Sequence, residues 1–487
     1  MSSVSATGAG LDAIVVGAGP NGLAAAIELA RAGRRVRVYE AADTVGGGTR
    51  SAELTLPGFI HDPCASVHPL SLASPFLRSL NLGRHGLVWV QPNAPVAHAL
   101  VPGRTVVLPR SLDGAALDDA LGHRDARGWR RLLGPLVADW ERLFPALLGP
   151  VLRAPRHPLL MARFGMPAVL PAAALARLAF RDPPARALFA GLAAHSMLPL
   201  WAPLSGSFGV VLATLAHAVG WPLAQGGSGA IAAALASEAQ ALGVEVVTGH
   251  RVDDLSTLPR VRAVVLDLTP RQVVAVAGDR LPAGYRRALE RFRYGPGVVK
   301  VDWALDGPIP WRDAGTAAAA TVHLGGQLAA VVRSEAAVAA GQTVADPFVL
   351  LVQPTVADPT RAPAGKHIAW AYCHVPNGSS EDLSSAIEAQ VERFAPGFRD
   401  LVLARAVKTA ADMEAWDANY VGGDINGGLA DWRQLVFRPV RRWNPYTTPV
   451  PGLFLGSSST PPGGGVHGMA GWHAARATER WLSRRVG

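Results

Sequence analysis

Charged residues are scarce in this sequence of 487 residues. Asp, Glu, Lys and Arg make up 17% of the chain, against roughly 25% in an average globular domain, while 49% of the residues are hydrophobic. That balance excludes an intrinsically disordered chain. Glycine and proline are common, with 52 and 39 copies, but together they stay below the roughly 25–30% typical of low-complexity sequence. We therefore expect a folded, loop-rich protein with a sizeable core.

Cysteine and lysine are also rare. The two cysteines, Cys64 and Cys373, form no CxxC pair, so the sequence indicates neither a redox-active dithiol nor a metal site. The net charge of +9 is almost entirely arginine dispersed among alanines, so we expect no nucleic-acid partner. The first residues lack the basic and apolar regions of a signal peptide. We predict a disordered tail over residues 1–10 and a cytoplasmic protein.

Long uninterrupted apolar runs are absent as well. Residues 187–237 carry no charged side chain, but prolines and glycines recur too often for a span of about 20 apolar residues. The stretch suits either an ordinary core or a long apolar pocket lined by Trp201, Phe208 and Trp221. Arginines near Trp129 and among the leucines of 153–163 suit either a solvated helix face or peripheral contact with a membrane from which a lipid substrate enters.

The first motif that carries chemistry is a glycine turn near the N-terminus. An apolar run over 12–16 leads directly into Gly17-Ala18-Gly19-Pro20-Asn21-Gly22, and a helical pattern follows to about residue 32. Gly17 permits a tight turn, Gly19 lets the backbone approach a pyrophosphate, and Gly22 lets the helix pack closely on the strand. A purely steric turn is the alternative, but strand, turn and helix in this order favour a dinucleotide site.

An acidic residue supports the same interpretation. A second apolar run over 35–39 ends at Glu40, 18 residues after Gly22, where a carboxylate accepts hydrogen bonds from a ribose with a free 2′-hydroxyl. This favours FAD or NAD over NADP. Gly46, Gly47 and Arg50 follow, and they suggest a second approach to the same anion, with Arg50 neutralising a phosphate. A flexible turn with a solvated arginine is the alternative.

Two later segments repeat the pattern of strand, glycine loop and helix. In the middle of the chain we expect a helix over 230–242 and strands over 244–248 and 263–268, without a second GxGxxG. The absence of a second fingerprint argues against a reductase with two Rossmann domains. Near the C-terminus a strand over 452–456 leads through a glycine-rich loop into a helix from about 471 to 485. That loop is either a linker or a donor of N–H groups to an electron-rich oxygen such as a flavin carbonyl.

Together these segments resemble the phytoene-desaturase-like flavoproteins of the amine-oxidase and carotenoid-desaturase superfamily. The resemblance rests on the first glycine turn with its acid, the Gly46-Gly47 doublet, the 226–252 block and the closing PGLFLG and PPGGGVHG segments. It implies an α/β fold with a Rossmann-like, glutathione-reductase-like FAD-binding domain and an inserted α+β substrate domain. The FAD-binding domain would comprise 10–100, 225–300 and 450–487, and the substrate domain 101–224 and 301–449.

The resemblance also implies which residues contact non-covalent FAD. They are Gly17, Gly19, Gly22 and Glu40 for the ADP half, Gly46, Gly47 and Arg50 for the pyrophosphate, Val252 for the adenine, and Gly456, Ser457, Gly468 and Met469 for the ribityl chain and isoalloxazine. Two positions depart from many relatives. Gly48 stands where they carry arginine, and Ser457 where they carry an acid. The C-terminal loop has no cysteine, which excludes a cysteinyl flavin there.

Flavin N5 accepts hydride, so desaturation needs an apolar cavity and in some cases a base for the second hydrogen. His467, in the C-terminal loop, is the first candidate, as a base or as a hydrogen-bond partner of the ring. Asp424, within a glycine-rich segment that also suits an Asx turn, is the second, and His68 is the third. A purely structural role is the alternative for each.

The leading hypothesis is an FAD-dependent oxidoreductase that abstracts hydride from a hydrophobic small molecule, such as a polyene or a specialised metabolite. A flavin amine oxidase is the second hypothesis, and it predicts an aromatic pair facing the flavin. A redox-neutral isomerase or a non-catalytic FAD-binding protein is the third.

Overall fold

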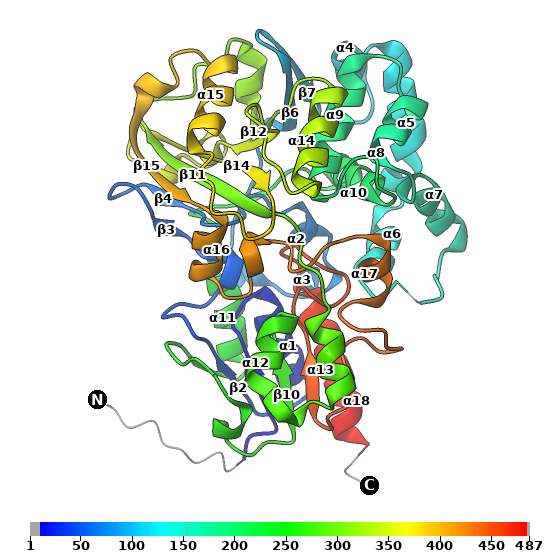
Figure 1. Cartoon of the computed structure of the whole chain (residues 1–487), viewed down its shortest axis with the longest axis vertical. Helices are drawn as coiled ribbons and strands as arrows, with labels where there is room; N and C mark the ends of the chain where they lie inside the picture. The colour runs from blue at the N-terminus through cyan, green and yellow to red at the C-terminus, as the bar shows by residue number, and fades with distance from the viewer. Residues whose placement is uncertain (1–9, 152, 485–487) are drawn as a thin grey trace.

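Two large β-sheets lie towards opposite ends of the molecule (Figure 1). The computed structural model describes residues 10–151 and 153–484. Most of the tail predicted over residues 1–10 therefore lies outside the described residues. The predicted domain boundaries stay predictions.

The first sheet has five parallel strands in the order β16-β10-β1-β2-β9. They are β1 (Ala13–Val16), β2 (Val36–Tyr39), β9 (Glu245–Val247), β10 (Ala263–Leu266) and β16 (Leu453–Leu455). Each lies where the sequence predicts a strand. Alternate residues of β1 enter different hydrophobic clusters, Ala13 and Val15 on one face and Ile14 and Val16 on the other. Both faces are therefore covered, as is usual for a parallel sheet.

Two glycines allow close packing around helix α1 (Pro20–Arg31), one against the glycine turn and one against the C-terminal helix α18 (Met469–Ser483). The two helices pack against each other. A Cβ on Gly471 would lie 1.7 Å from the carbonyl oxygen of Asn21, and a Cβ on Gly22 would lie 1.9 Å from that of Gly17. No real Cβ fits at such distances, so any larger residue at either position would push the backbones apart.

The second sheet has seven strands in the order β15-β11-β14-β13-β12-β6-β7. Neighbours are antiparallel except β6 and β12. The strands are β6 (Ala94–Val101), β7 (Arg104–Leu108), β11 (Gly297–Leu305), β12 (Ala319–Leu324), β13 (Val349–Val352), β14 (His367–Val375) and β15 (Val402–Lys408). Two small ribbons pair β3 (Ala52–Glu53) with β4 (Ile60–His61), and β5 (Trp89–Val90) with β8 (Leu223–Ala224).

Helices surround both sheets. The remaining α-helices are α2 (Pro69–Ala73), α3 (Pro75–Arg78), α4 (Ala115–Leu121), α5 (His123–Ala138), α6 (Trp140–Leu147), α7 (Pro158–Ala168), α8 (Ala172–Ala179), α9 (Pro183–Ala194), α10 (Ser205–Ala218), α11 (Gly229–Ala241), α12 (Pro270–Ala277), α13 (Ala283–Glu290), α14 (Leu328–Ala339), α15 (Ser384–Phe394), α16 (Ala410–Trp416) and α17 (Trp432–Phe437). Helices α4 to α10 gather beside the seven-stranded sheet (Figure 1). Among the described residues no single helix has the length and apolar character needed to cross a bilayer. Within the described chain, α7 and α8 reach that length and apolar composition only when they are taken together, and a bend of 103° lies between them.

Candidate functional site

A cavity of about 550 Å³ lies between the two sheets. At one end it is lined by the segments that follow β1, β2 and β10, and at the other by side chains of β12, β13 and β14. The carboxyl ends of parallel strands are where α/β sheets bind their ligands. The cavity thus joins the predicted dinucleotide turn to a wall of the second sheet.

The glycine turn and Glu40 form one rigid unit at the first end. Gly17 has a φ of +99° and donates its N–H to Tyr39 O at 2.8 Å, which ties the turn to β2. The Glu40 carboxylate accepts hydrogen bonds from the N–H groups of Ala18 at 2.7 Å and Ala42 at 2.9 Å. Each carboxylate oxygen keeps a second lone pair, so Glu40 is held at the cavity wall and can still accept from a hydroxyl.

The residues present fit a flavin dinucleotide at this end. Asn21, in the first turn of α1, lines the cavity, and its Oδ1 is buried without a hydrogen-bond partner. A Cβ on Gly47 would lie 3.3 Å from Gly19 Cα, so glycine at this position lets the two backbone segments approach each other closely. The unpaired N–H groups of a helix N-terminus favour a pyrophosphate there.

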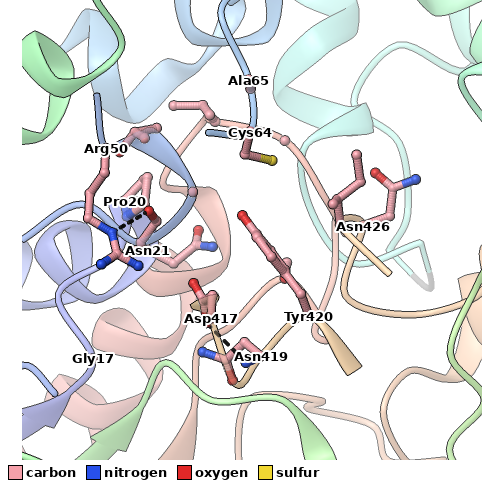
Figure 2. Close-up of a pocket in the computed structure, with 18 of the residues that line it drawn as sticks. Gly17, Pro20, Asn21, Arg50, Cys64, Ala65, Asp417, Asn419, Tyr420 and Asn426 are labelled. Carbon is pink, nitrogen blue, oxygen red and sulfur yellow. Dashed lines mark hydrogen bonds between the residues drawn. The ribbon is translucent and has the colours of Figure 1, made fainter. Parts of the chain in front are cut away.

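Gly48, the first departure from the relatives, has a steric reason. A Cβ on Gly48 would lie 2.1 Å from the hydroxyl oxygen of Tyr420. Figure 2 shows the Tyr420 side chain extending into the pocket with its hydroxyl directed towards Cys64. Arg50 lies on the other side, where Nε donates to Gly47 O at 3.0 Å and the guanidinium stacks 4.2 Å above the Trp416 ring. Arg50 reaches the cavity, but its orientation is fixed by these two contacts.

Two acids that sequence reasoning missed stand beside the glycine turn. Asp267 directly follows β10, and its Oδ2 accepts the Gly22 N–H at 2.8 Å. Burial raises the pKa of Asp267 to about 8, with a further contribution from the negative charges of Asp417 and Glu40. Burial likewise raises the pKa of Asp417. Asp267 lies within the strand predicted over 263–268, but only the pairing of β10 with β1 shows that it lies beside the glycine turn.

The structure brings half of the predicted cofactor residues to the cavity. Those lining it are Gly17, Gly19, Glu40, Gly47, Arg50 and Val252. The others, all within the described part of the chain, are not among the lining residues. Gly22 is in α1 and Met469 begins α18, while Gly46, Gly456, Ser457 and Gly468 lie in loops. Their assigned contacts with FAD stay predictions.

Of the three predicted catalytic residues, only His68 lines the cavity. The Ser228 hydroxyl donates to Ala65 O, so Ser228 Oγ accepts the proton of His68 Nε2, 2.8 Å away. Nδ1 of His68 therefore carries a lone pair, and it is buried without a partner. Burial lowers the pKa of His68 to about 4, which keeps the ring neutral at pH 7. The same burial makes His68 a weaker base than a free imidazole, and its catalytic role stays a prediction.

His467 and Asp424 are occupied by backbone contacts. His467 is buried, and its Nδ1 accepts the Met469 N–H at 3.0 Å, at the start of α18. Asp424 is buried and accepts N–H groups of Gly295, Asn426 and Gly428 at 2.7–2.8 Å. The Asx turn foreseen as the alternative for Asp424 is therefore present. Neither side chain is among the described lining residues of the cavity, and their catalytic roles stay predictions.

The far wall of the cavity is apolar and aromatic. Trp370 and Tyr372 of β14 line it with nearly parallel rings, 13° apart and 5.9 Å between centroids. Leucine, valine and tryptophan side chains complete the wall: Leu212, Trp221, Leu350 and Val352. Of the three residues expected to line a pocket in the uncharged stretch, Trp221 does. Trp201, which is 60% exposed, and Phe208 are not among the described lining residues. Trp129 is also buried rather than on an arginine-rich surface, and it donates to His217 at 2.9 Å.

A buried charge pair lies next to the cavity lining, where Asp62 accepts a hydrogen bond from the lining residue Ser66. Arg361 contacts Asp62 at 2.9 Å, and both side chains are almost completely buried. Asp62 also accepts hydrogen bonds from Ser51, Ser66 and Ser228. Arginine and these donors hold the pKa of Asp62 below its usual value despite its burial. The network ties the segment after β4 to the start of α11.

Comparisons with known proteins agree with this architecture. Residues 15–80 match the family of NAD(P)-binding Rossmann-like domains. Pyridine nucleotide-disulfide oxidoreductase domain-containing protein 2 of Rattus norvegicus is 28% identical over 549 aligned positions, covering 97% of this chain and 94% of that protein. Phytoene dehydrogenase of Streptomyces griseus is 29% identical, and the alignment covers 80% of this chain and 77% of that protein. A triple mutant of putrescine oxidase has a similar structure, with a TM-score of 0.61 at 18% identity and coverage of 97% and 99%. The predicted α/β fold with a Rossmann-like domain is confirmed.

Proposed function

Because the chain belongs to the amine-oxidase and carotenoid-desaturase superfamily of flavoproteins, we propose that it is an FAD-dependent oxidoreductase acting on a hydrophobic small molecule. The reaction we propose is removal of hydride with formation of a carbon–carbon double bond, as in a desaturase or dehydrogenase. One observation carries the proposal, namely that a single cavity joins the glycine turn to an aromatic and aliphatic wall.

Each end of the cavity has a distinct task in this proposal. Gly19, Asn21 and Glu40 would hold the pyrophosphate and ribose of FAD, which supplies the hydride acceptor when bound. The apolar wall excludes water and positions the carbon chain of the substrate. His68, with the lone pair of Nδ1 unpartnered, would accept the proton from the neighbouring carbon.

The test is anaerobic mixing of the purified, yellow protein with polyenes and other apolar substrates. Loss of the yellow flavin band on mixing would support hydride removal. Retention of the band with a converted substrate would favour the redox-neutral alternative. A preparation that stays colourless in excess FAD would refute the proposal.

A flavin amine oxidase is the second candidate function. The stacked pair Trp370 and Tyr372 on the cavity wall favours it, since that hypothesis requires two aromatic rings beside the reacting carbon. The structural likeness to putrescine oxidase shows the fold alone. Hydrogen peroxide production across a panel of amines distinguishes this candidate, because a desaturase would leave all of them unchanged.

We also propose that the α7 side of the molecule rests on an anionic lipid surface. Leu159 and Met166, seven residues apart on one face of α7, are 79% and 67% exposed. Residues 142–181 contain six arginines and neither aspartate nor glutamate. One of the six, Arg142, pairs with Asp139. Exposed apolar side chains in a segment with excess arginine fit the headgroup boundary of anionic lipids. Helix α10, which packs against α7, contributes Leu212 to the cavity, so a lipid-like substrate would have a short path.

A further inference from the structure

Three histidines form a row that begins at the cavity and continues into the seven-stranded sheet. His195 directly follows α9 and lines the cavity. Its Nε2 lies 3.0 Å from Nε2 of His323 on β12. The His323 ring then meets the His98 ring of β6 edge to face, with centroids 5.8 Å apart. The hydride transfer proposed above uses none of the three.

Gly191 explains how the inner two histidines face each other. A Cβ on Gly191 would lie 2.6 Å from Nδ1 of His98 and 2.4 Å from Nδ1 of His323. Both nitrogens therefore point at one spot and are at most about 5 Å apart. Both are buried and have no hydrogen-bond partner. Any side chain at this position of α9 would displace at least one ring.

The hydrogen bond at the inner end of the row is the starting point for assigning the ring tautomers of the three histidines. His98 Nε2 lies 2.7 Å from the carbonyl oxygen of Gly326. A carbonyl only accepts, so His98 carries its proton on Nε2 and a lone pair on Nδ1. The two Nδ1 atoms make no hydrogen bond with each other, but a proton on His323 Nδ1 would avoid placing two lone pairs face to face, so the geometry favours that tautomer of His323. His323 Nε2 then accepts, and His195 donates to it from its own Nε2.

These assignments require neutral rings, and burial provides them. Burial lowers the pKa of His98 to about 4 and that of His195 to about 3, and it holds the pKa of His323 well below its usual value. A neutral His195 with its proton on Nε2 has a lone pair on Nδ1. Since Nε2 is directed at His323, Nδ1 is the nitrogen that His195 offers to the cavity.

The surroundings of His195 select an uncharged partner. Like His195, the side chains of Leu212, Leu350, Val352 and Thr321 line the cavity, and the Thr321 hydroxyl accepts a hydrogen bond from Trp221 Nε1 at 2.8 Å. Among the described lining residues the only carboxylates are those of Glu40, Asp267 and Asp417, all at the dinucleotide end. An ammonium group would find no counter-ion at this wall, and the lone pair of His195 would repel a carboxylate.

We propose that His195 determines specificity by accepting, at Nδ1, a hydrogen bond from a hydroxyl group on an otherwise apolar substrate. The substrate class is thus a hydrophobic alcohol, such as a hydroxylated polyene. His323 is a positioning residue that holds His195 in the accepting tautomer. An ether or ketone of the same shape is disfavoured because it brings no proton and leaves the buried lone pair unpaired. This inference rests on the proposed function, since it places the alcohol in the same cavity as the reacting carbon.

The first test reads the tautomers directly. Protein labelled with nitrogen-15 in histidine is examined by long-range proton–nitrogen NMR, with His98→Gln, His195→Gln and His323→Gln used for assignment. We expect the proton on Nε2 in His98 and His195 and on Nδ1 in His323. A proton on Nδ1 of His195 would overturn the proposal.

The second test measures binding through the fluorescence of Trp221 and Trp370, which line the cavity. Decanol should bind about 5- to 10-fold more tightly than decyl methyl ether, the value of one neutral hydrogen bond. His195→Leu should bring this affinity ratio to about 1. Gly191→Ala should do the same, because its methyl group displaces the rings of His98 and His323. His367→Gln, at the start of β14 and outside the row, is the matched control and should keep the ratio of the unaltered protein.

Equal binding of alcohol and ether by the unaltered protein would overturn the inference, and so would a ratio that survives in His195→Leu. Failure of this inference and failure of the proposed function give different results. Protein that distinguishes the alcohol but never binds flavin would refute only the oxidoreductase, whereas yellow protein that treats both ligands alike would refute only the role of His195.

Discussion

Replacing Asp267 by asparagine should stabilise the cofactor-free protein, increasingly so at higher pH. The folded protein holds the pKa of this carboxyl at about 8, because burial and the neighbouring acids Asp417 and Glu40 disfavour its charge. In the unfolded chain it ionises with its ordinary pKa near 3.8. Folding therefore requires proton uptake between these values, and stability falls as pH rises from about 4 to 8 and is constant above. The asparagine side chain of the variant would still accept the Gly22 N–H through its carbonyl oxygen and would carry no charge.

The expected change in the free energy of unfolding follows from the uptake of one proton by Asp267 on folding. Between pH 5 and pH 8 the penalty on Asp267 grows by up to about 4 kcal/mol, at 1.36 kcal/mol per pH unit. Unfolding entropy of about 2.1 cal/mol/K per residue makes 1 kcal/mol worth about 1 °C in a chain of 487 residues that unfolds in one transition. The melting temperature of Asp267→Asn should therefore exceed that of the unaltered protein by up to about 4 °C more at pH 8 than at pH 5.

The assay is thermal unfolding of flavin-stripped protein at pH 5, 6, 7, 8 and 9. Asp43→Asn, an exposed carboxylate near the same end of the cavity, is the control and should show no such trend. A difference between Asp267→Asn and the unaltered protein that is the same at every pH would refute the reasoning. So would a difference that shrinks as pH rises.

Three further predictions concern other parts of the molecule. Gly19→Val should give colourless protein, because its side chain would fill the space between the turn and Asp267, 2.9 Å from a Cβ; the ratio of flavin to protein absorbance checks this. Arg361→Ala should lower the melting temperature, measured by thermal unfolding, by about 3–5 °C, because it leaves Asp62 buried without its cation. Arg251→Ala, which removes an exposed ion pair with Asp253, is the control and should change the melting temperature by less than about 1 °C. The double variant of α7, with aspartate at both Leu159 and Met166, should no longer sediment with phosphatidylglycerol vesicles; undiminished sedimentation would contradict the proposed lipid contact.

Sequence alone was sufficient to predict the glycine turn and the elements around it, because its signals are local. Gly17, Gly19 and Glu40 lie within 24 consecutive residues, and their order already specifies a strand, a turn, a helix and a second strand. The structure places all three at the cavity. Helix and strand positions in the 226–268 block and at the C-terminus were also predictable, since apolar periodicity and glycine punctuation depend on neighbouring residues.

The cavity walls were decided by tertiary structure. The Gly22–Asp267 and His195–His323 contacts join residues 245 and 128 positions apart, and no local pattern indicates which distant strand will lie opposite. The same limit explains why His467 and Asp424 drew attention while His195 did not. Glycine-rich segments such as those around His467 and Asp424 form backbone turns, and buried polar side chains there accept hydrogen bonds from backbone N–H groups. His195 instead follows an apolar helix, where no local pattern indicates that its imidazole faces a cavity. Local sequence patterns therefore determined the glycine turn at one end of the cavity, and the packing of one sheet against the other decided the shape and polarity of the opposite wall.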